Sequence, residues 1–141
     1  MKGVKNKDYW NKGQRLNKGK HNFRKLQIWT DAMELAKVIY DLVADISREE
    51  RYGLVSQLRR CTVSVPSNIA EGSSRTSDKE FAHFLRISLG SCYEIETQVI
   101  LAYEFGYFSK TQCNEVLDKL ILLQKKIVNF IKTLDVHKRK E

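Results

Sequence analysis

Residues 57–72 read QLRRCTVSVPSNIAEG, and the spacing of the apolar side chains in and just before this segment predicts an α-helix. These side chains recur at steps of three and four residues, as they do along one helical face: Leu54, Leu58, Cys61, Val65 and Ile69. Upstream, Ser47 and Glu50 fit a capping box, and Gly72 fits a helix stop. The sequence therefore predicts one long helix that begins after Ser47 and ends near Gly72.

Pro66 is the only proline in the chain, and it falls inside this predicted helix. A proline removes a backbone donor and crowds the carbonyl group one turn earlier, which costs about 3 kcal/mol in an unsupported helix. The neighbouring side chains of Ser64, Ser67 and Asn68 can bond to the backbone groups that proline leaves free. We therefore predict a helix that is kinked at Pro66 and held by tertiary packing.

Three other segments have the same helical periodicity, and none alternates as a strand does. They extend over about residues 23–46, 77–105 and 109–134. Four amphipathic helices joined by short loops pack as antiparallel neighbours. The predicted fold is all-α, an antiparallel up-down-up-down four-helix bundle over residues 23–136, with tails at 1–22 and 137–141.

Local signals mark the ends of the last two helices. Ser77 with Glu80 and Ser109 with Gln112 fit capping boxes, in which the two side chains bond to each other's backbone N–H groups. Gly106 fits the stop of the third helix. The turn between these helices is therefore predicted to be short.

The charge of +8 is concentrated at the N-terminus, because residues 1–25 hold nine basic side chains against Asp8 and the rest of the chain is balanced. Residues 1–22 have no apolar periodicity, so we predict a basic tail that is disordered when free. Tyr9, Trp10 and Phe23 lie among the lysines, which suits phosphate neutralisation combined with base stacking. The alternative is a solubilising extension. The candidate nucleic-acid contacts in this segment are Lys12, Arg15, Lys18, Lys20, Arg24 and Lys25.

Arg59 and Arg60 are neighbours that lie about 100° apart around the second helix. Because Leu58 and Cys61 point inward, at least one of the two arginines faces outward or across a subunit boundary. One interpretation is an ion pair with a carboxylate, and the candidates are Glu71, Glu94 and Glu96. The other is a phosphate contact shared with Arg75 and Lys79 near the following loop, because a guanidinium fits both partners. We favour the structural role for Arg60 and leave Arg59 open.

Four polar residues lie close to the apolar faces: Gln57, Ser64, Asn68 and Gln98. Such residues are more often a buried hydrogen-bond network than a binding site. We therefore predict that Asn68 fixes helix register or assembly.

Composition argues against several classes of protein. No window approaches 18 apolar residues, so no membrane span is predicted, and the basic N-terminus lacks the apolar run of a secretion signal. Cys61, Cys92 and Cys113 are widely spaced on apolar faces, which favours buried thiols in a reducing, cytoplasmic setting. No nucleophile motif or phosphate loop is present, so we predict a protein that is not an enzyme and needs no cofactor.

One short motif suggests a metal site. Glu80 and His83 have the Glu-x-x-His spacing of di-iron bundles. Those sites need a second copy of the motif and two further inward glutamates. The sequence has one copy, and Glu80 already belongs to a capping box, so no metal is predicted.

The second helix also resembles a known family. Tyr52-Gly53-Leu54, Gln57-Leu58-Arg59-Arg60 and Ser64-Val65-Pro66-Ser67-Asn68-Ile69-Ala70-Glu71-Gly72 are similar to the signature of the 23S-rRNA intervening-sequence proteins. Phe81, Phe84-Leu85, Gly90-Ser91 and Gly106-Tyr107 resemble its third helix and following turn. The resemblance covers about residues 23–135 and leaves the basic tail outside.

The resemblance implies barrel-like homopentamers of four-helix bundles. It also links the chain to the accessory protein of diversity-generating retroelements, which partners a reverse transcriptase and binds nucleic acid. We therefore expect a homo-oligomer that binds nucleic acid, RNA above all, through the tail and surface arginines. The alternative is an accessory subunit of a reverse transcriptase.

Overall fold

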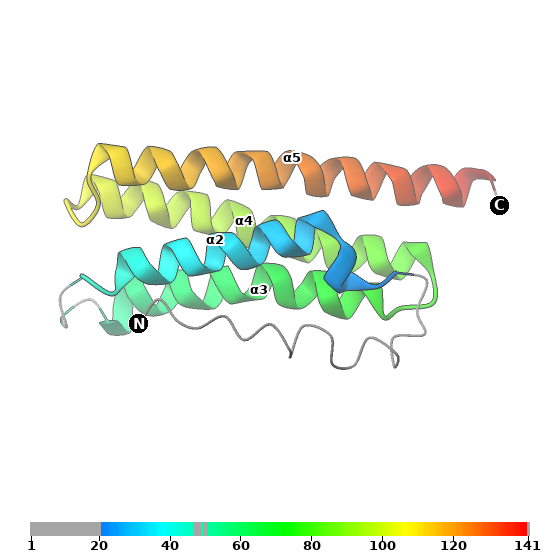
Figure 1. Cartoon of the computed structure of the whole chain (residues 1–141), viewed down its shortest axis with the longest axis horizontal. Coiled ribbons are helices and arrows are strands. Elements are labelled where there is room, and N and C mark those ends of the chain that lie inside the picture. Colours follow the sequence, from blue (N-terminus) through cyan, green and yellow to red (C-terminus); the bar gives the residue numbers. More distant parts are fainter. Residues whose placement is uncertain (1–20, 47–48, 50, 141) are drawn as a thin grey trace.

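The computed structural model describes residues 21–140 except 47, 48 and 50, and these residues form a bundle of helices (Figure 1). The long helices are α2 (Gln27–Val43), α3 (Ser56–Ser73), α4 (Asp78–Glu104) and α5 (Lys110–Lys140). The short helical turn η2 (Phe23–Lys25) precedes α2, and the segment η4 (Arg51–Val55), which precedes α3, is interrupted by a kink at Gly53. The described residues include no strand, so the prediction of an all-helical bundle is confirmed.

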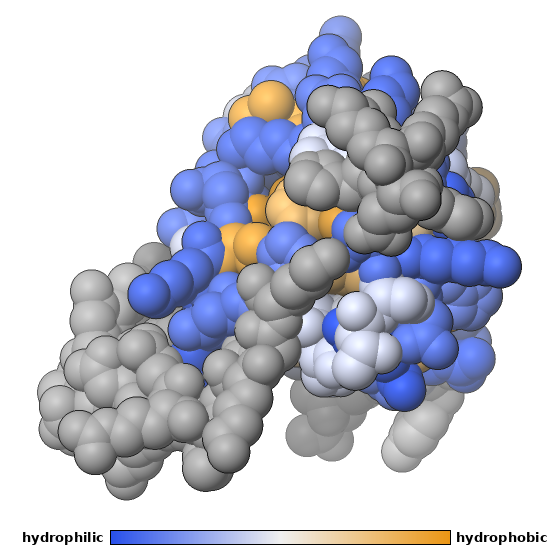
Figure 2. Space-filling model, turned by 90° about the vertical axis from the view of Figure 1, so that its right-hand side faces the viewer, coloured by the Kyte–Doolittle hydropathy of each residue, from blue (hydrophilic) through white to orange (hydrophobic). Residues whose placement is uncertain are grey.

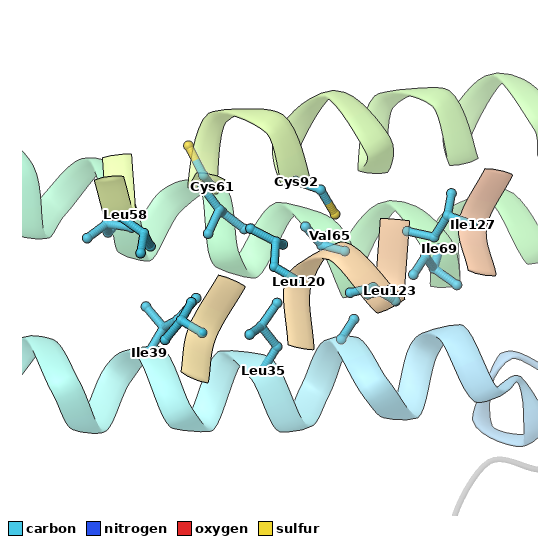
Figure 3. Close-up of a cluster of buried hydrophobic side chains, with 14 of the residues drawn as sticks. Leu35, Ile39, Leu58, Cys61, Val65, Ile69, Cys92, Leu120, Leu123 and Ile127 are labelled. Atoms are coloured by element: carbon cyan, nitrogen blue, oxygen red, sulfur yellow. The ribbon is translucent and has the colours of Figure 1, made fainter. Parts of the chain in front are cut away.

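The helices enclose one hydrophobic core. Contacts join α2 to α3, α3 to α4, α4 to α5 and α5 back to α2, so each long helix buries its apolar face against two neighbours. Figure 3 shows side chains from the helices meeting along the axis of this core, among them Leu35, Leu58, Cys92 and Leu120. Trp29 is also buried and packs edge to face on Phe23, with ring centroids 5.2 Å apart.

The helix ends match the local signals in part. The Ser77 hydroxyl accepts from the Glu80 amide (3.1 Å), and Ser109 and Gln112 bond to each other's amides (3.1 and 2.9 Å). Gly106 has φ +83°, as expected for the residue that ends α4. The capping box predicted at Ser47 lies outside the described residues.

Three predicted boundaries differ from the structure. The first helix was expected to be continuous over residues 23–46, but Leu26 is extended and separates η2 from α2, which ends at Val43. α5 continues to Lys140, so most of the segment 137–141 extends the last helix. The second helix was expected to begin just after Ser47, but Gly53 has non-helical φ and ψ (−98° and −108°) and α3 begins at Ser56, while its end at Ser73 agrees with the stop expected near Gly72.

Gly72 also allows α3 and α4 to approach closely. A Cβ atom at this position would lie 2.7 Å from the Cβ of Phe84 and 2.9 Å from Cδ1 of Phe81. These distances are shorter than van der Waals contact, so the absence of a side chain sets the packing of the first turns of α4 on the end of α3.

α3 is continuous on both sides of Pro66, and tertiary contacts support the helix there. The Asn68 amide donates to the Ser64 carbonyl (2.8 Å), and the buried Ser88 hydroxyl of α4 donates to the Val65 carbonyl (2.9 Å). The Asn68 bond lies within α3, and the Ser88 bond joins α4 to α3; the carbonyl that the proline leaves without its helical donor is that of Thr62. The kink itself stays a prediction.

Candidate nucleic-acid interface

The N-terminal segment meets the bundle at His21. The His21 ring packs edge to face on Phe81 of α4 (centroids 5.0 Å apart) and on Phe130 of α5 (5.8 Å), and those two rings lie 5.4 Å apart. This cluster places the start of the described chain beside the first turn of α4. Sequence reasoning missed the role of His21, because nothing in its local sequence indicates an aromatic partner.

A groove lies at the same end of the bundle, at the turn between α3 and α4. It has a volume of about 570 Å³ and is lined by Arg75, Ser77, Lys79, Glu80, His83 and Phe84. The Arg75 guanidinium stands 4.7 Å above the centroid of the Phe84 ring and pairs with Glu71 at 3.1 Å. The structure therefore brings together Arg75 and Lys79, which the sequence proposed as phosphate contacts.

Residues 26–141 carry balanced charge overall, and both ends of the bundle have charged side chains. Near the groove lies η2, with Arg24 and Lys25 (Figure 1). Figure 2 views this end and shows mainly hydrophilic residues around smaller hydrophobic areas. The opposite end, around the α4–α5 turn, has the exposed carboxylates of Asp41, Asp45, Glu104 and Glu115. Glu71 and Glu80 lie close to Arg75 and Lys79 at the groove, so the N-terminal segment joins the bundle at an end where both signs of charge are present.

Arg59 and Arg60 lie elsewhere, about 20–25 Å along α3 from Arg75 at 1.5 Å per residue. Arg59 is half-buried and faces α2, where its guanidinium carbon is 5.3 Å from the centroid of the Tyr40 ring. Its Nε atom is buried and has no hydrogen-bond partner among the described residues. Arg60 is exposed.

The ion pair predicted for these two arginines does not form within the described chain. Glu71 pairs with Arg75 one turn along α3. Glu94 accepts from the Cys61 thiol (3.1 Å), and Glu96 accepts from Gln124 of α5 (3.0 Å). All three carboxylates therefore have other partners, and Arg59 points toward α2 rather than α4.

A polar seam joins α3 to α4 as the sequence suggested. Asn68 donates to the Ser64 hydroxyl (3.0 Å), which also bonds to the Ser91 hydroxyl (2.8 Å). Gln98 donates to the Cys61 sulfur (3.6 Å), whereas Gln57 is exposed and lies outside the seam. Gln57 was therefore wrongly placed in this network.

The described residues contain no cluster of three His, Cys, Asp or Glu side chains that could hold a metal ion, and Glu80 and His83 are both exposed at the groove. Burial raises the pKa of Cys61 to about 11 and that of Cys92 to about 12, so both thiols are protonated near neutral pH. None of the described helices is long and apolar enough to cross a bilayer.

The remaining candidates lie in the N-terminal segment. Lys12, Arg15, Lys18 and Lys20 fall outside the described residues, as do residues 1–20 as a whole. What the structure gives is the point at which this segment joins the bundle.

Comparisons with known proteins agree with the family suggested by the second helix. A family model described as 23S rRNA-intervening sequence protein matches residues 24–129. A crystal structure of a protein of unknown function from the S23 ribosomal protein family of Bacteroides thetaiotaomicron aligns with 74% of this chain and 98% of that chain, with a TM-score of 0.68 and 21% identity. At that identity the similarity shows the fold alone. No curated protein matches the sequence.

Proposed function

The chain belongs to the 23S rRNA-intervening sequence protein family, and from this premise we propose that it is a non-catalytic, homo-oligomeric protein that binds structured RNA through its basic N-terminal segment and surface arginines. The observation that carries the proposal is the packing of His21 on Phe81 and Phe130. It joins the most basic part of the sequence to the end of the bundle at which Arg75 and Lys79 line a groove.

The binding mechanism is electrostatic. Lysine and arginine side chains displace cations condensed on the RNA backbone, and the release of those cations favours binding at low salt. Phosphates are the same in every sequence, so this attraction gives little sequence preference. Tyr9 and Trp10 of the N-terminal segment add stacking partners for unpaired bases.

The proposed bundle has an up-down-up-down order and assembles as a homopentamer, as the family resemblance implies. The alternating directions of successive helices in Figure 1 support that order. Two different faces support assembly. Tyr93, Ile100 and Ile121 are 39–51% exposed on α4 and α5, and on the α2–α3 side Tyr40 and Val63 are exposed beside Arg59. Two unlike faces on one bundle favour head-to-tail contacts, which form a ring when the rotation between copies closes.

Assembly would strengthen RNA binding without new contacts. Each subunit adds one basic segment, so an RNA held by one segment meets the next at high effective concentration.

The test compares the full chain with a full-length variant in which Lys12, Arg15, Lys18 and Lys20 are replaced by glutamine. Binding to a structured RNA is measured by fluorescence anisotropy over a range of salt concentrations. If all four side chains contact phosphates, the slope of log K against log salt falls by about 3–4. The matched control replaces four exposed lysines of the bundle: Lys37, Lys110, Lys119 and Lys125.

We expect the four-lysine control variant to keep most of the wild-type slope of log K against log salt. Equal binding by the wild type and the N-terminal variant would refute the role of this segment. Light-scattering mass with and without RNA tests the assembly, and a monomer at working concentration would refute it. Assembly without any RNA binding would favour the alternative, an accessory subunit of a reverse transcriptase.

A further inference from the structure

The Phe84 ring forms the floor of the groove at the α3–α4 turn, and packing against α3 holds this ring in place. Phe84 is half-buried, and its Cβ lies against Gly72, where any side chain on α3 would push it away. The helix that presents it begins at Ser77, whose hydroxyl caps α4. The ring is therefore held at the surface by backbone packing and not by a flexible loop.

Two cationic side chains, the planar guanidinium of Arg75 and the ammonium group of Lys79, lie beside this ring. Arg75 is oriented by Glu71 (3.1 Å) and stacks 4.7 Å above Phe84, while the His83 ring meets Phe84 edge to face at 5.7 Å. Lys79 is exposed at the rim. Glu80 lines the groove and Glu71 pairs with Arg75, so the attraction for an anion rests on Lys79 and on the guanidinium N–H groups of Arg75 that do not face Glu71.

These groups match one class of ligand. A flat ring finds stacking partners in Phe84, Arg75 and His83, and an attached anion finds Arg75 and Lys79. A phosphate joined to an aromatic base has both features. The volume of about 570 Å³ is in the range of small-ligand sites and is too small for a duplex.

We propose that this groove receives one unpaired nucleotide of an RNA chain, with its phosphate against Arg75 and Lys79 and its base against Phe84. The inference rests on the RNA-binding function proposed above and adds a preference for unpaired bases. A nucleotide within a chain is favoured over a free one, because η2 lies at the same end of the bundle and offers Arg24 and Lys25 to the flanking phosphates.

The experiment uses the full chain and two RNAs with the same number of phosphates, a perfect duplex and a hairpin with an unpaired loop. Phe84→Leu removes the ring and keeps the side chain apolar, and Phe105→Leu is the control, because Phe105 is 64% exposed at the opposite end of the bundle. We expect Phe84→Leu to weaken hairpin binding about tenfold and duplex binding by less than about twofold. Phe105→Leu should change neither.

Lys79→Gln is a second variant that leaves the core intact, with Lys110→Gln in the first turn of α5 as its control. We expect a several-fold loss for Lys79→Gln on the hairpin and none for Lys110→Gln. Unchanged hairpin binding by both Phe84→Leu and Lys79→Gln would overturn the proposal. The proposal would also be overturned if adenosine monophosphate bound in the groove without displacing either RNA.

The two proposals fail in different ways. If the full chain binds neither RNA, the proposed function is refuted. If it binds both RNAs equally and with steep salt dependence, RNA binding stands and only the groove inference is lost.

Discussion

The same substitution at two helical glycines should have opposite effects on stability. Gly72 lies in α3 and Gly90 lies in α4. Alanine is favoured over glycine in a helix interior by about 1 kcal/mol, and by less near a helix end. Nothing lies within 4 Å of a Cβ built at Gly90, so Gly90→Ala should raise the free energy of unfolding by up to about 1 kcal/mol.

At Gly72 the new methyl group has no room. It would lie 2.7 Å from the Cβ of Phe84, an atom that no side-chain rotation can move. The end of α3 and the start of α4 must then separate, which is an overpacking cost of about 1–3 kcal/mol. After the gain in helix propensity, we expect Gly72→Ala to lower the free energy of unfolding by about 1–2 kcal/mol.

Urea unfolding followed by circular dichroism measures both variants. All proteins are compared at one concentration, because assembly would make the midpoint depend on it. Equal stabilisation by the two substitutions would refute the close approach of α3 and α4 at Gly72. Destabilisation by Gly90→Ala would show that the surface around Gly90 is covered in solution.

Two further predictions concern the polar seam and the thiols. Asn68→Leu removes the donor to the Ser64 carbonyl and hydroxyl (2.8 and 3.0 Å). The free energy of unfolding, measured in urea, should therefore fall by about 1–2 kcal/mol. Unchanged melting and an unchanged oligomer mass would argue against the seam. Burial raises the pKa of Cys92 to about 12, so native Cys92 should react with iodoacetamide far more slowly than the urea-unfolded thiol, and equal rates would contradict its burial. The folded state holds the Cys92 proton more tightly than the unfolded state does. The stabilisation that results is complete below the ordinary thiol pKa of 9.0 and is lost as the pH rises toward 12. A urea midpoint that falls over this pH range would record the loss.

Much of the fold could be predicted from residues near each other in sequence. Side chains such as Leu58, Val65 and Ile69 repeat with the helical period, and that period alone says which face of the helix must leave water. Capping is equally local, so Ser109, Gln112 and Gly106 indicated a turn that the structure contains. The concentration of charge in residues 1–25 is likewise a property of the sequence.

The candidate site depended on contacts between helices, which periodicity does not specify. Arg75 and Lys79 could be named from the sequence, but their meeting with Phe84 requires the rotation of α4 against α3. The same applies to Arg59, which faces Tyr40 of α2 although its sequence allowed a carboxylate on α4.

The four helices, the positions of their apolar faces and the basic N-terminal segment could all be read from the sequence. That Gly72 is a close contact between α3 and α4, and that His21 packs at one end of the bundle, is evident only once the helices are packed together. The physical reason is that a helix fixes the relative positions of its own side chains, whereas the distance and rotation between helices depend on how all four pack together.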